Sequence, residues 1–535
     1  MKSIKKFLAV ILSMTLMLTL GTATFGAQKT LPSGKDTGSI NVTNLKPGDT
    51  VIAYQFVKAD YNEYGFTGYS AINNYVKDPV APTAQEVIDM ASNAATMTVA
   101  AEKKVATGDT EVTLNGLPVG YYLVMVTSGS ETVYSPMIAG IYYSKSATDN
   151  TLTNGAISAD SDFEIKAQKC WAKSSTPKLE KTIVTPSSKN SKGDDIAIGD
   201  KITFNLSATV PSYSKEYKKV TYKIYDIMSE GLDYVDGSMK CFIEKYENNR
   251  ENIKVTPKVN GGIIEITFDS KFILEHPGQK IQVEYQAKLN EKAGVNFDAN
   301  INKAYLEYSN NPASGSTAKT GEDKVYVYTF GIDSNLFGKS TEKWNEKTKE
   351  LIKVEEGEYQ WGETEKESGI FTTTTALEGA TFTLTNNKTK KSYTATSDKY
   401  GYLKFTGLDA GEYTLQETDA PDGFTLNDAK HTVVITAEYN QDGTLKSYTI
   451  KIDDKATSTY TATYDKGVIK TITSTKDSQG NISESAILKN SKMSFLPSTG
   501  GVGTTIFAIV GVVFVAAALG LHMILRGKSK LEQDR

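Results

Sequence analysis

Apolar and polar residues alternate with a period of two over much of the chain. Residues 202–206 read Ile, Thr, Phe, Asn, Leu, and residues 304–308 read Ala, Tyr, Leu, Glu, Tyr. This period is typical of a β-strand that buries one face. Turn-forming stretches separate such segments, for example Lys-Pro-Gly-Asp at residues 46–49. The pattern predicts an all-β protein.

Only one stretch outside the two ends predicts a helix. Residues 84–93 follow Pro82 and Thr83, and their apolar residues fall on one helical face. We expect this helix to cap an edge of the first domain. Strands are expected around it at residues 39–42, 50–54, 112–114, 121–126 and 163–167.

The N-terminus has the pattern of a secretory signal peptide. Lys2, Lys5 and Lys6 precede an apolar run at residues 7–20, and small residues at 21–27 offer a cleavage site near residue 27. The sequence therefore predicts an exported chain whose mature part begins near residue 28.

The C-terminus combines a pentapeptide, an apolar run and a basic tail. The pentapeptide consists of Leu496, Pro497, Ser498, Thr499 and Gly500. Residues 504–525 carry no formal charge and would span about 33 Å as a helix, enough to cross a bilayer core. Arg526, Lys528 and Lys530 follow, and such a basic end stays cytoplasmic.

This arrangement resembles the LPxTG sorting signal of Gram-positive surface proteins. The resemblance implies that a sortase cuts between Thr499 and Gly500 and holds Thr499 as a thioester. An amine then displaces the thioester, so the carboxyl of Thr499 ends as an amide. The chain is expected to be fixed covalently at the cell wall, after a transient stay of its C-terminal helix in the plasma membrane.

Composition agrees with a strand-rich exported protein and excludes several functions. The chain has 30 Tyr and 42 Gly among its 535 residues. Its net charge is only -4, and its sequence has no cluster of basic and aromatic residues of the kind that binds nucleic acid. Its two cysteines, Cys170 and Cys241, cannot form a disulfide framework, although one bridge or two separate thiols remain open. The three histidines lie far apart, so we expect no metal site, no cofactor and no catalytic triad.

Composition shifts and a short repeat divide the chain. The predicted parts are a signal peptide (1–27), an N-terminal domain (28–173), a second domain (174–324), a third domain (325–490) with a polar insertion (339–375), and the sorting region (491–535). Residues 407–415 echo residues 116–124, which suggests that domains one and three share a sandwich plan.

The third domain resembles the B-type domain of collagen adhesins, a small immunoglobulin-like sandwich of Gram-positive pilins. Residues 377–384 and the E-box segment 413–424 carry the match. In that family a first-strand Lys attacks a last-strand Asn with help from the E-box Glu, giving an isopeptide bond. The resemblance assigns Glu417 and Asn490 these roles, with Lys339 as the amine and Lys343 or Lys347 as alternatives. The repeat aligns Val126 with Glu417, so no such bond is expected in domain one.

Burial explains why this chemistry needs these residue types. A buried Lys loses its charge more readily and a buried carboxyl keeps its proton, so the pair supplies a nucleophilic amine and a proton donor. The acid then polarises the amide carbonyl and shuttles a proton as ammonia leaves.

The second domain resembles the A-type partner of the same family. Residues 177–183 match its opening strand and residues 302–310 its closing strand. Alternation places Lys181 and Asn302 among core positions, where unpaired polar groups would be costly. The family pattern makes Asp226 the acid, with Glu284 as the fallback.

The resemblance as a whole predicts a major pilin made of tandem immunoglobulin-like sandwiches. Residues 171–174 (Trp, Ala, Lys, Ser) stand where major pilins carry the lysine that attacks the next subunit, so Lys173 is our candidate, with Lys169 and Lys166 competing. Its implied partners are a class C pilus sortase, a housekeeping sortase, copies of itself, minor pilins and peptidoglycan. A wall-anchored adhesin that binds a host or matrix ligand is the alternative.

Overall fold

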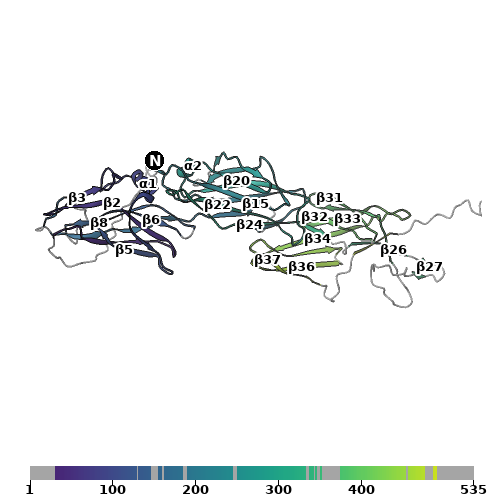
Figure 1. Cartoon of the computed structure of the whole chain (residues 1–535). Helices are drawn as coiled ribbons and strands as arrows, with labels where there is room; N and C mark the ends of the chain where they lie inside the picture. The colour runs from purple at the N-terminus through teal and green to yellow at the C-terminus, as the bar shows by residue number, and fades with distance from the viewer. Residues whose placement is uncertain are drawn as a thin grey trace, which may run out of the picture.

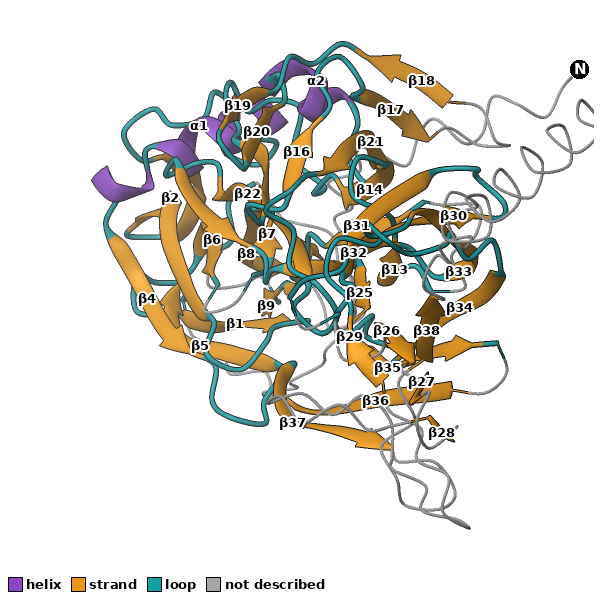
Figure 2. Cartoon of the chain, turned by 90° about the vertical axis from the view of Figure 1, so that its right-hand side faces the viewer, coloured by secondary structure: helices purple, strands orange, loops and turns teal. Residues whose placement is uncertain are grey.

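A computed structural model gives the fold of most of the chain between its two ends. The structure describes residues 31–128, 131–145, 155–158, 162–184, 190–244, 250–332, 337–342, 344–345, 350–351, 374–399, 401–453, 456–475 and 486–490. Three β-sandwich units follow one another end to end in chain order (Figure 1), which confirms the all-β prediction. In these described ranges strands dominate, and the α-helices are short (Figure 2).

The first unit pairs a large sheet with a small one. Its large sheet has the strand order β3-β2-β6-β8-β9, with β4 also on β2, and its small sheet has the order β10-β1-β5. The elements are β1 (Thr37–Thr43), β2 (Thr50–Asn62), β3 (Gly65–Ala71), α1 (Ala84–Ser92), β4 (Val99–Lys104), β5 (Glu111–Pro118), β6 (Gly120–Thr127), β7 (Val133–Tyr134), β8 (Met137–Ser144), β9 (Glu164–Ala167), β10 (Lys169–Trp171) and β11 (Ser174–Ser175).

Helix α1 forms where the sequence predicts it, but it covers a sheet face and not an edge. Thr83 caps its N-terminus in a capping box with Glu86. Val87, Met90 and Ala91 pack against residues of the central strands β2 and β6. The edge placement was therefore wrong, because the apolar stripe of the helix needs a broad apolar surface to cover.

The second unit is a sandwich of two larger sheets. Their strand orders are β12-β14-β21-β17-β18, with β16 on β21, and β13-β24-β22-β15-β20-β19, with β23 on β22. The elements are β12 (Leu179–Ile183), β13 (Gly193–Asp195), β14 (Lys201–Thr209), β15 (Tyr222–Met228), β16 (Leu232–Tyr234), β17 (Lys240–Glu244), β18 (Arg250–Ile253), β19 (Lys258–Asn260), β20 (Ile263–Thr267), α2 (Ser270–Glu275), β21 (Lys280–Leu289), β22 (Asn300–Asn311), β23 (Ser316–Lys319) and β24 (Asp323–Tyr328).

The third unit is built on one long sheet. Its order is β31-β30-β33-β34-β35-β36-β37, faced by the small sheets β25-β32 and β29-β26-β38. The elements are β25 (Phe330–Ile332), β26 (Phe337–Glu342), β27 (Trp344–Asn345), β28 (Glu350–Leu351), β29 (Thr374–Ala376), β30 (Thr381–Asn386), β31 (Ser392–Thr396), β32 (Phe405–Leu408), β33 (Gly411–Asp419), β34 (Lys430–Tyr439), β35 (Leu445–Ile452), β36 (Ala456–Asp465), β37 (Val468–Thr475) and β38 (Ala486–Asn490). In the predicted insertion, β27 and β28 pair as a hairpin.

Strand β24 lies where the sequence places the start of the third domain, yet it belongs to the second sandwich. It pairs with β22 and β13. Val325 and Val327 pack in the second core, whereas Tyr326 and Tyr328 pack in the third. The period of two lets one strand serve both cores, so the predicted boundary at residue 325 cuts through a shared strand.

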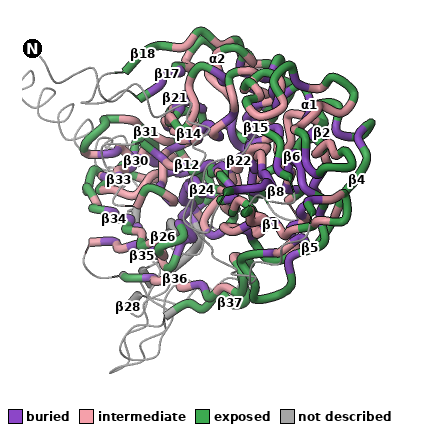
Figure 3. The backbone as a smooth tube through the Cα atoms, turned by 90° about the vertical axis from the view of Figure 1, so that its left-hand side faces the viewer, coloured by how far each residue is buried: buried purple, intermediate pink, exposed green. Residues whose placement is uncertain are grey.

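Buried residues fill the interior of each unit (Figure 3). Cys170 and Cys241 are both buried and free, in different cores, so they are separate thiols and not a bridge. Burial raises the pKa of each thiol to about 12. Within the described ranges, no helix is both long and apolar enough to cross a membrane, and the span predicted at residues 504–525 lies outside them.

Units two and three meet through a carboxylate at the end of β13. Asp195 accepts hydrogen bonds from the backbone N–H of Ala410 at 2.5 Å and from the hydroxyl of Tyr439 at 2.6 Å. Burial is the main reason that the pKa of Asp195 rises to about 6, and the charges of Asp194 and Asp409 raise it further. The junction is therefore predicted to respond to pH.

We expect this junction to lose stability as the pH rises from about 4 to 7. A carboxyl whose pKa is raised by folding stabilises the fold fully below its unfolded pKa and loses that contribution as the pH rises through its folded pKa. The difference between 3.8 and about 6 corresponds to at most about 3 kcal/mol. Thermal unfolding of the Asp195→Asn variant should lack this part of the pH dependence. Parallel pH profiles for the two proteins would contradict the assignment.

Candidate functional site

The second sandwich brings Lys181, Asp226 and Asn302 together in its core. Lys181 lies on β12 in one sheet, whereas Asp226 and Asn302 lie on the neighbouring strands β15 and β22 of the other. Buried residues alternate with less buried ones along each strand, and these three residues take buried positions. All three are fully buried, with no measurable exposed surface.

A tyrosine that the sequence analysis did not single out connects these groups. Lys181 Nζ donates to the Asp226 carboxylate and to Tyr285 Oη, the latter at 3.0 Å. Tyr285 Oη donates to Asp226 Oδ1 at 2.7 Å and accepts from Asn302 Nδ2 at 2.7 Å. Tyr285 is an inward-facing residue of β21, a position that its strand alternation could have indicated.

Desolvation dominates the electrostatics of the cluster. Burial lowers the pKa of Lys181 and raises that of Asp226, and in each case the partner's charge opposes the effect. Both shifts favour proton transfer from the ammonium to the carboxylate. The amine also lies 5.0 Å from the ring centroid of Phe204 and 5.2 Å from that of Tyr285. The cluster can therefore hold a neutral amine beside a protonated acid.

Polar contacts also hold the backbone of Lys181 in place. Its N–H donates to Asp323 Oδ2 at 2.7 Å, and its carbonyl accepts from Lys192 Nζ at 2.6 Å. Lys192 and Asp323 in turn form an ion pair of 2.6 Å. The fallback acid Glu284 is partly exposed and lies 3.7 Å from Arg250, outside the buried cluster.

In the third sandwich, Glu417 faces the core from β33. It is only 2% exposed, its Oε2 accepts from the backbone N–H of Asn427 at 2.7 Å, and it lies opposite the core residue Phe382 on β30. Strands β26 and β38, which hold Lys339 and Asn490, pair in parallel with Lys339 opposite Leu488. Leu488 packs in the same core as Phe382. The alternative amines at positions 343 and 347 lie outside the described residues.

Domains one and three share the strand plan that the short repeat suggested. The order β3-β2-β6-β8-β9 matches β31-β30-β33-β34-β35. Tyr122 Oη donates to the carbonyl of Pro118 at 2.5 Å, and Tyr413 Oη donates to the carbonyl of Asp409 at 2.8 Å. Both domains therefore have a tyrosine that bonds to the backbone four residues earlier. Val126, at the position that aligns with Glu417, is a buried apolar residue.

Three families match parts of the chain. Residues 35–174 match the T6 antigen Ig-like domain, residues 370–451 match the SpaA prealbumin-like fold domain, and residues 489–530 match the LPXTG cell wall anchor motif.

One relative extends along nearly the whole chain. The trypsin-resistant surface T6 protein of Streptococcus pyogenes serotype M6 is 26% identical over 549 aligned residues, covering 93% of this chain and 96% of that protein. The solved structure of the T6 backbone pilin of serotype M6 S. pyogenes, described as a modular three-domain structure, covers 86% of this chain and all of that one. Its TM-score is 0.56 at 20% identity, which supports the shared fold.

The chain is therefore similar in sequence to a streptococcal surface protein over most of its length, and it shares the fold of a solved backbone pilin. The match at residues 489–530 supports a surface protein that is anchored to the cell wall.

The three candidate linking lysines differ in their surroundings. Lys173 is exposed, and its backbone carbonyl accepts from the N–H of Ser135 at 3.0 Å. Lys169 is exposed on β10. Lys166 is half-buried on β9 and lies 3.9 Å from Glu164. Lys173 alone lies at the junction of the first two sandwiches, between β10 and β11.

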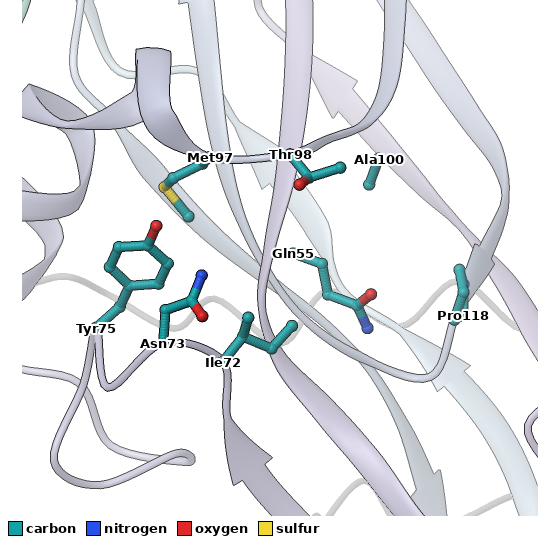
Figure 4. A pocket seen from close by; sticks show the side chains of 8 residues that line it. All are labelled: Gln55, Ile72, Asn73, Tyr75, Met97, Thr98, Ala100 and Pro118. Atoms are coloured by element: carbon teal, nitrogen blue, oxygen red, sulfur yellow. The ribbon is translucent and has the colours of Figure 1, made fainter.

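The first sandwich also has a small hollow, whose lining residues include none of these lysines (Figure 4). It has a volume of about 310 Å³ and is lined by Gln55, Ile72, Asn73, Tyr75, Met97, Thr98, Ala100 and Pro118. None of these side chains carries a charge, so the hollow supplies no carboxylate or amine for covalent chemistry.

Proposed function

We propose that this chain is a pilin that forms the shaft of a covalent pilus, and that Lys–Asn isopeptide bonds brace its second and third sandwiches. The buried cluster of Lys181, Asp226 and Asn302 is the observation that carries the proposal. Burying a charged lysine and an amide in a core costs free energy, because each must leave water. Their presence together in this core therefore supports a chemical role.

The chemistry in the second sandwich follows from the proton positions. Asp226 takes a proton from the Lys181 ammonium, and the neutral amine attacks Cγ of Asn302. The new N–Cγ bond forms, the Cγ–Nδ2 bond breaks, and the amide nitrogen leaves as ammonia with the proton that the acid supplies. The amine nitrogen loses its second proton to the carboxylate, so Asp226 ends protonated. The sandwich supplies the orientation that makes this reaction intramolecular.

Such a bond would join the two sheets of the sandwich. It would tie β12, the first strand, to β22, which lies in the opposite sheet. Tension that enters near β12 could pass to β22 without first separating the hydrogen-bonded strands between them. A shaft subunit that is pulled lengthwise benefits from this route.

In the third sandwich we propose the corresponding bond between Lys339 and Asn490, promoted by Glu417. The parallel register of β26 and β38 supports this pairing, because Asn490 is two residues beyond Leu488, the partner of Lys339. Positions two apart lie on the same face of a strand, so the register places Lys339 and Asn490 at neighbouring positions of the paired strands.

For assembly we propose that Thr499 of one subunit joins Lys173 of the next. A class C pilus sortase would make this link, and a housekeeping sortase would transfer the finished shaft to peptidoglycan. Minor pilins are expected at its ends, and a host or matrix ligand would belong to the alternative function, a wall-anchored adhesin that is not polymerised.

Gel electrophoresis of boiled cell-wall extracts tests the assembly proposal. A shaft subunit gives a ladder of denaturation-resistant species at regular mass intervals. A single band at the mass of one subunit attached to wall fragments would instead favour the adhesin or minor pilin.

Intact mass of the mature chain tests the role of Glu417. We expect the wild-type protein to lack the mass of two ammonia molecules and the Glu417→Gln variant to lack only one, because the amide cannot act as the acid. Glu412→Gln is the matched control, since Glu412 is an exposed residue of the same strand whose carboxylate accepts from Asn387. Equal masses for the Glu417→Gln variant and its control, after correction for the substitutions, would remove Glu417 from the reaction.

A further inference from the structure

Among the described residues of the second sandwich, Tyr285 forms the hydrogen-bonded connection between the acid Asp226 and the leaving group of Asn302. Within the part of the chain that the structure describes, the side chain of Asn302 makes one hydrogen bond, from Nδ2 to Tyr285 Oη at 2.7 Å. Asp226 reaches Lys181 through Oδ2 and Tyr285 through Oδ1. The carboxyl therefore contacts the amine directly but reaches the amide nitrogen only through the phenol.

Because of this arrangement, Asp226 cannot pass a proton directly to the amide nitrogen of Asn302. The amide nitrogen of Asn302 needs a proton to leave as ammonia, because an amide anion is a very poor leaving group. Asp226 holds that proton after it has deprotonated Lys181, on the far side of the Tyr285 hydroxyl. The site is fully buried, so bulk water does not supply the proton.

We propose that Tyr285 is a catalytic residue that relays the proton from Asp226 to Nδ2 of Asn302. The role rests on the isopeptide bond proposed above. Attack on Cγ makes Nδ2 a basic amine nitrogen, and Asp226 is by then protonated, so both hydrogen bonds of the phenol reverse. The acid gives its proton to the phenol oxygen while the phenol proton passes to Nδ2. The Cγ–Nδ2 bond breaks, ammonia leaves, and the tyrosine ends with the number of protons with which it began. The carboxylate of Asp226 then takes the second proton of the attacking nitrogen.

The surroundings of Tyr285 suit a relay and not a permanent base. Burial and the nearby Asp226 charge raise the pKa of the phenol well above its ordinary value, so the hydroxyl stays neutral and keeps a proton to pass on. Its ring packs against Phe204 at 5.5 Å and Tyr234 at 5.9 Å between centroids, and these contacts hold the hydroxyl toward the three reacting groups.

The Tyr285→Phe variant tests the relay, with Tyr222→Phe as its matched control. Tyr222 lies on β15 in the same core, is 1% exposed, and its hydroxyl has no hydrogen-bond partner among the described residues. Each chain would be made in a cell-free reaction, quenched in denaturant at timed intervals and digested. Mass spectrometry then measures the peptide that joins Lys181 to Asn302.

We expect the Tyr285→Phe variant to form this peptide on the order of 10²-fold more slowly than the wild type, the lower range for general acid catalysis. The Tyr222→Phe variant should keep a rate near that of the wild type. A wild-type rate in the Tyr285→Phe variant would overturn the relay and leave the bond itself intact. Absence of the joined peptide from the wild-type chain would instead overturn the proposed function.

A second measurement tests the relay in the wild-type chain, without a substitution at position 285. Supplying 3-fluorotyrosine in the cell-free reaction makes every phenol more acidic with little change of shape. The relay predicts a changed rate of bond formation in the wild-type and Tyr222→Phe chains, and no change in the Tyr285→Phe chain. An equal rate with and without fluorine in the wild-type chain would contradict the relay.

Discussion

The Lys181→Met variant is expected to lose about 5 kcal/mol from the free energy of unfolding of the second sandwich. Its loop from Lys181 to Asn302 would no longer be closed in the unfolded chain, and the chain-entropy treatment of cross-links gives this magnitude for a loop of that length. Methionine keeps most of the buried volume, and Asp226 can remain protonated beside it. Chemical denaturation of the mature chain, followed by the transition of the second sandwich, measures the loss.

Lys223→Met is the control for this experiment. Lys223 lies on β15 in the same sandwich and makes a partly exposed ion pair with Glu265 at 3.2 Å. Exposed pairs of this kind contribute up to about 1 kcal/mol. If both variants lost the same small amount, no cross-link would be present in the second sandwich.

The Lys173→Ala variant is expected to abolish the ladder of covalent polymers while leaving the subunit folded. The Lys173 side chain is exposed, so its removal opens no cavity, and the backbone on either side is held by the hydrogen bonds of Ser135 to Lys173 and of Ala172 to Thr43. Without this amine the sortase thioester at Thr499 would have only water or peptidoglycan as acceptor. Gels of boiled wall extracts report the result.

Lys169→Ala and Lys166→Ala serve as matched controls for the linking lysine. Both remove a lysine from the last strands of the same sandwich, and both variants should keep the ladder. A ladder that persists in the Lys173→Ala variant and disappears in one of these would move the link to that residue and leave the shaft function unchanged.

At the candidate site, the sequence predicted the burial of two polar residues. Lys181 and Asn302 stand at positions where alternation demands apolar residues, and the structure places both in the core with Asp226. A polar residue at a core position is visible in the sequence because the period of two identifies its face. The family pattern then indicated which carboxyl to choose, and the structure places Glu284 outside the cluster.

The residues that were missed illustrate the limit of the same argument. Tyr285 is one of 30 tyrosines and follows its strand pattern like any core aromatic, so nothing in its position marks it as a link between Lys181 and Asn302. Helix α2 is too short, at six residues, to show a helical period. Strand β24 was assigned to the third domain because both of its faces are apolar, so its alternation does not show which core each face joins.

By itself, the sequence predicted that the chain is exported and attached to the cell wall, and it predicted which side chains of each strand face the core. The sorting signal, the signal peptide and the period of two are local patterns, so they can be recognised without knowing which strands meet. Only the tertiary structure decided the partners: it brings Lys181 to Tyr285, 104 positions along the chain, and aligns Asn302 beside both. The physical reason is that alternation specifies the face of a strand, whereas the order and packing of the sheets, which depend on contacts across the whole domain, specify what that face meets.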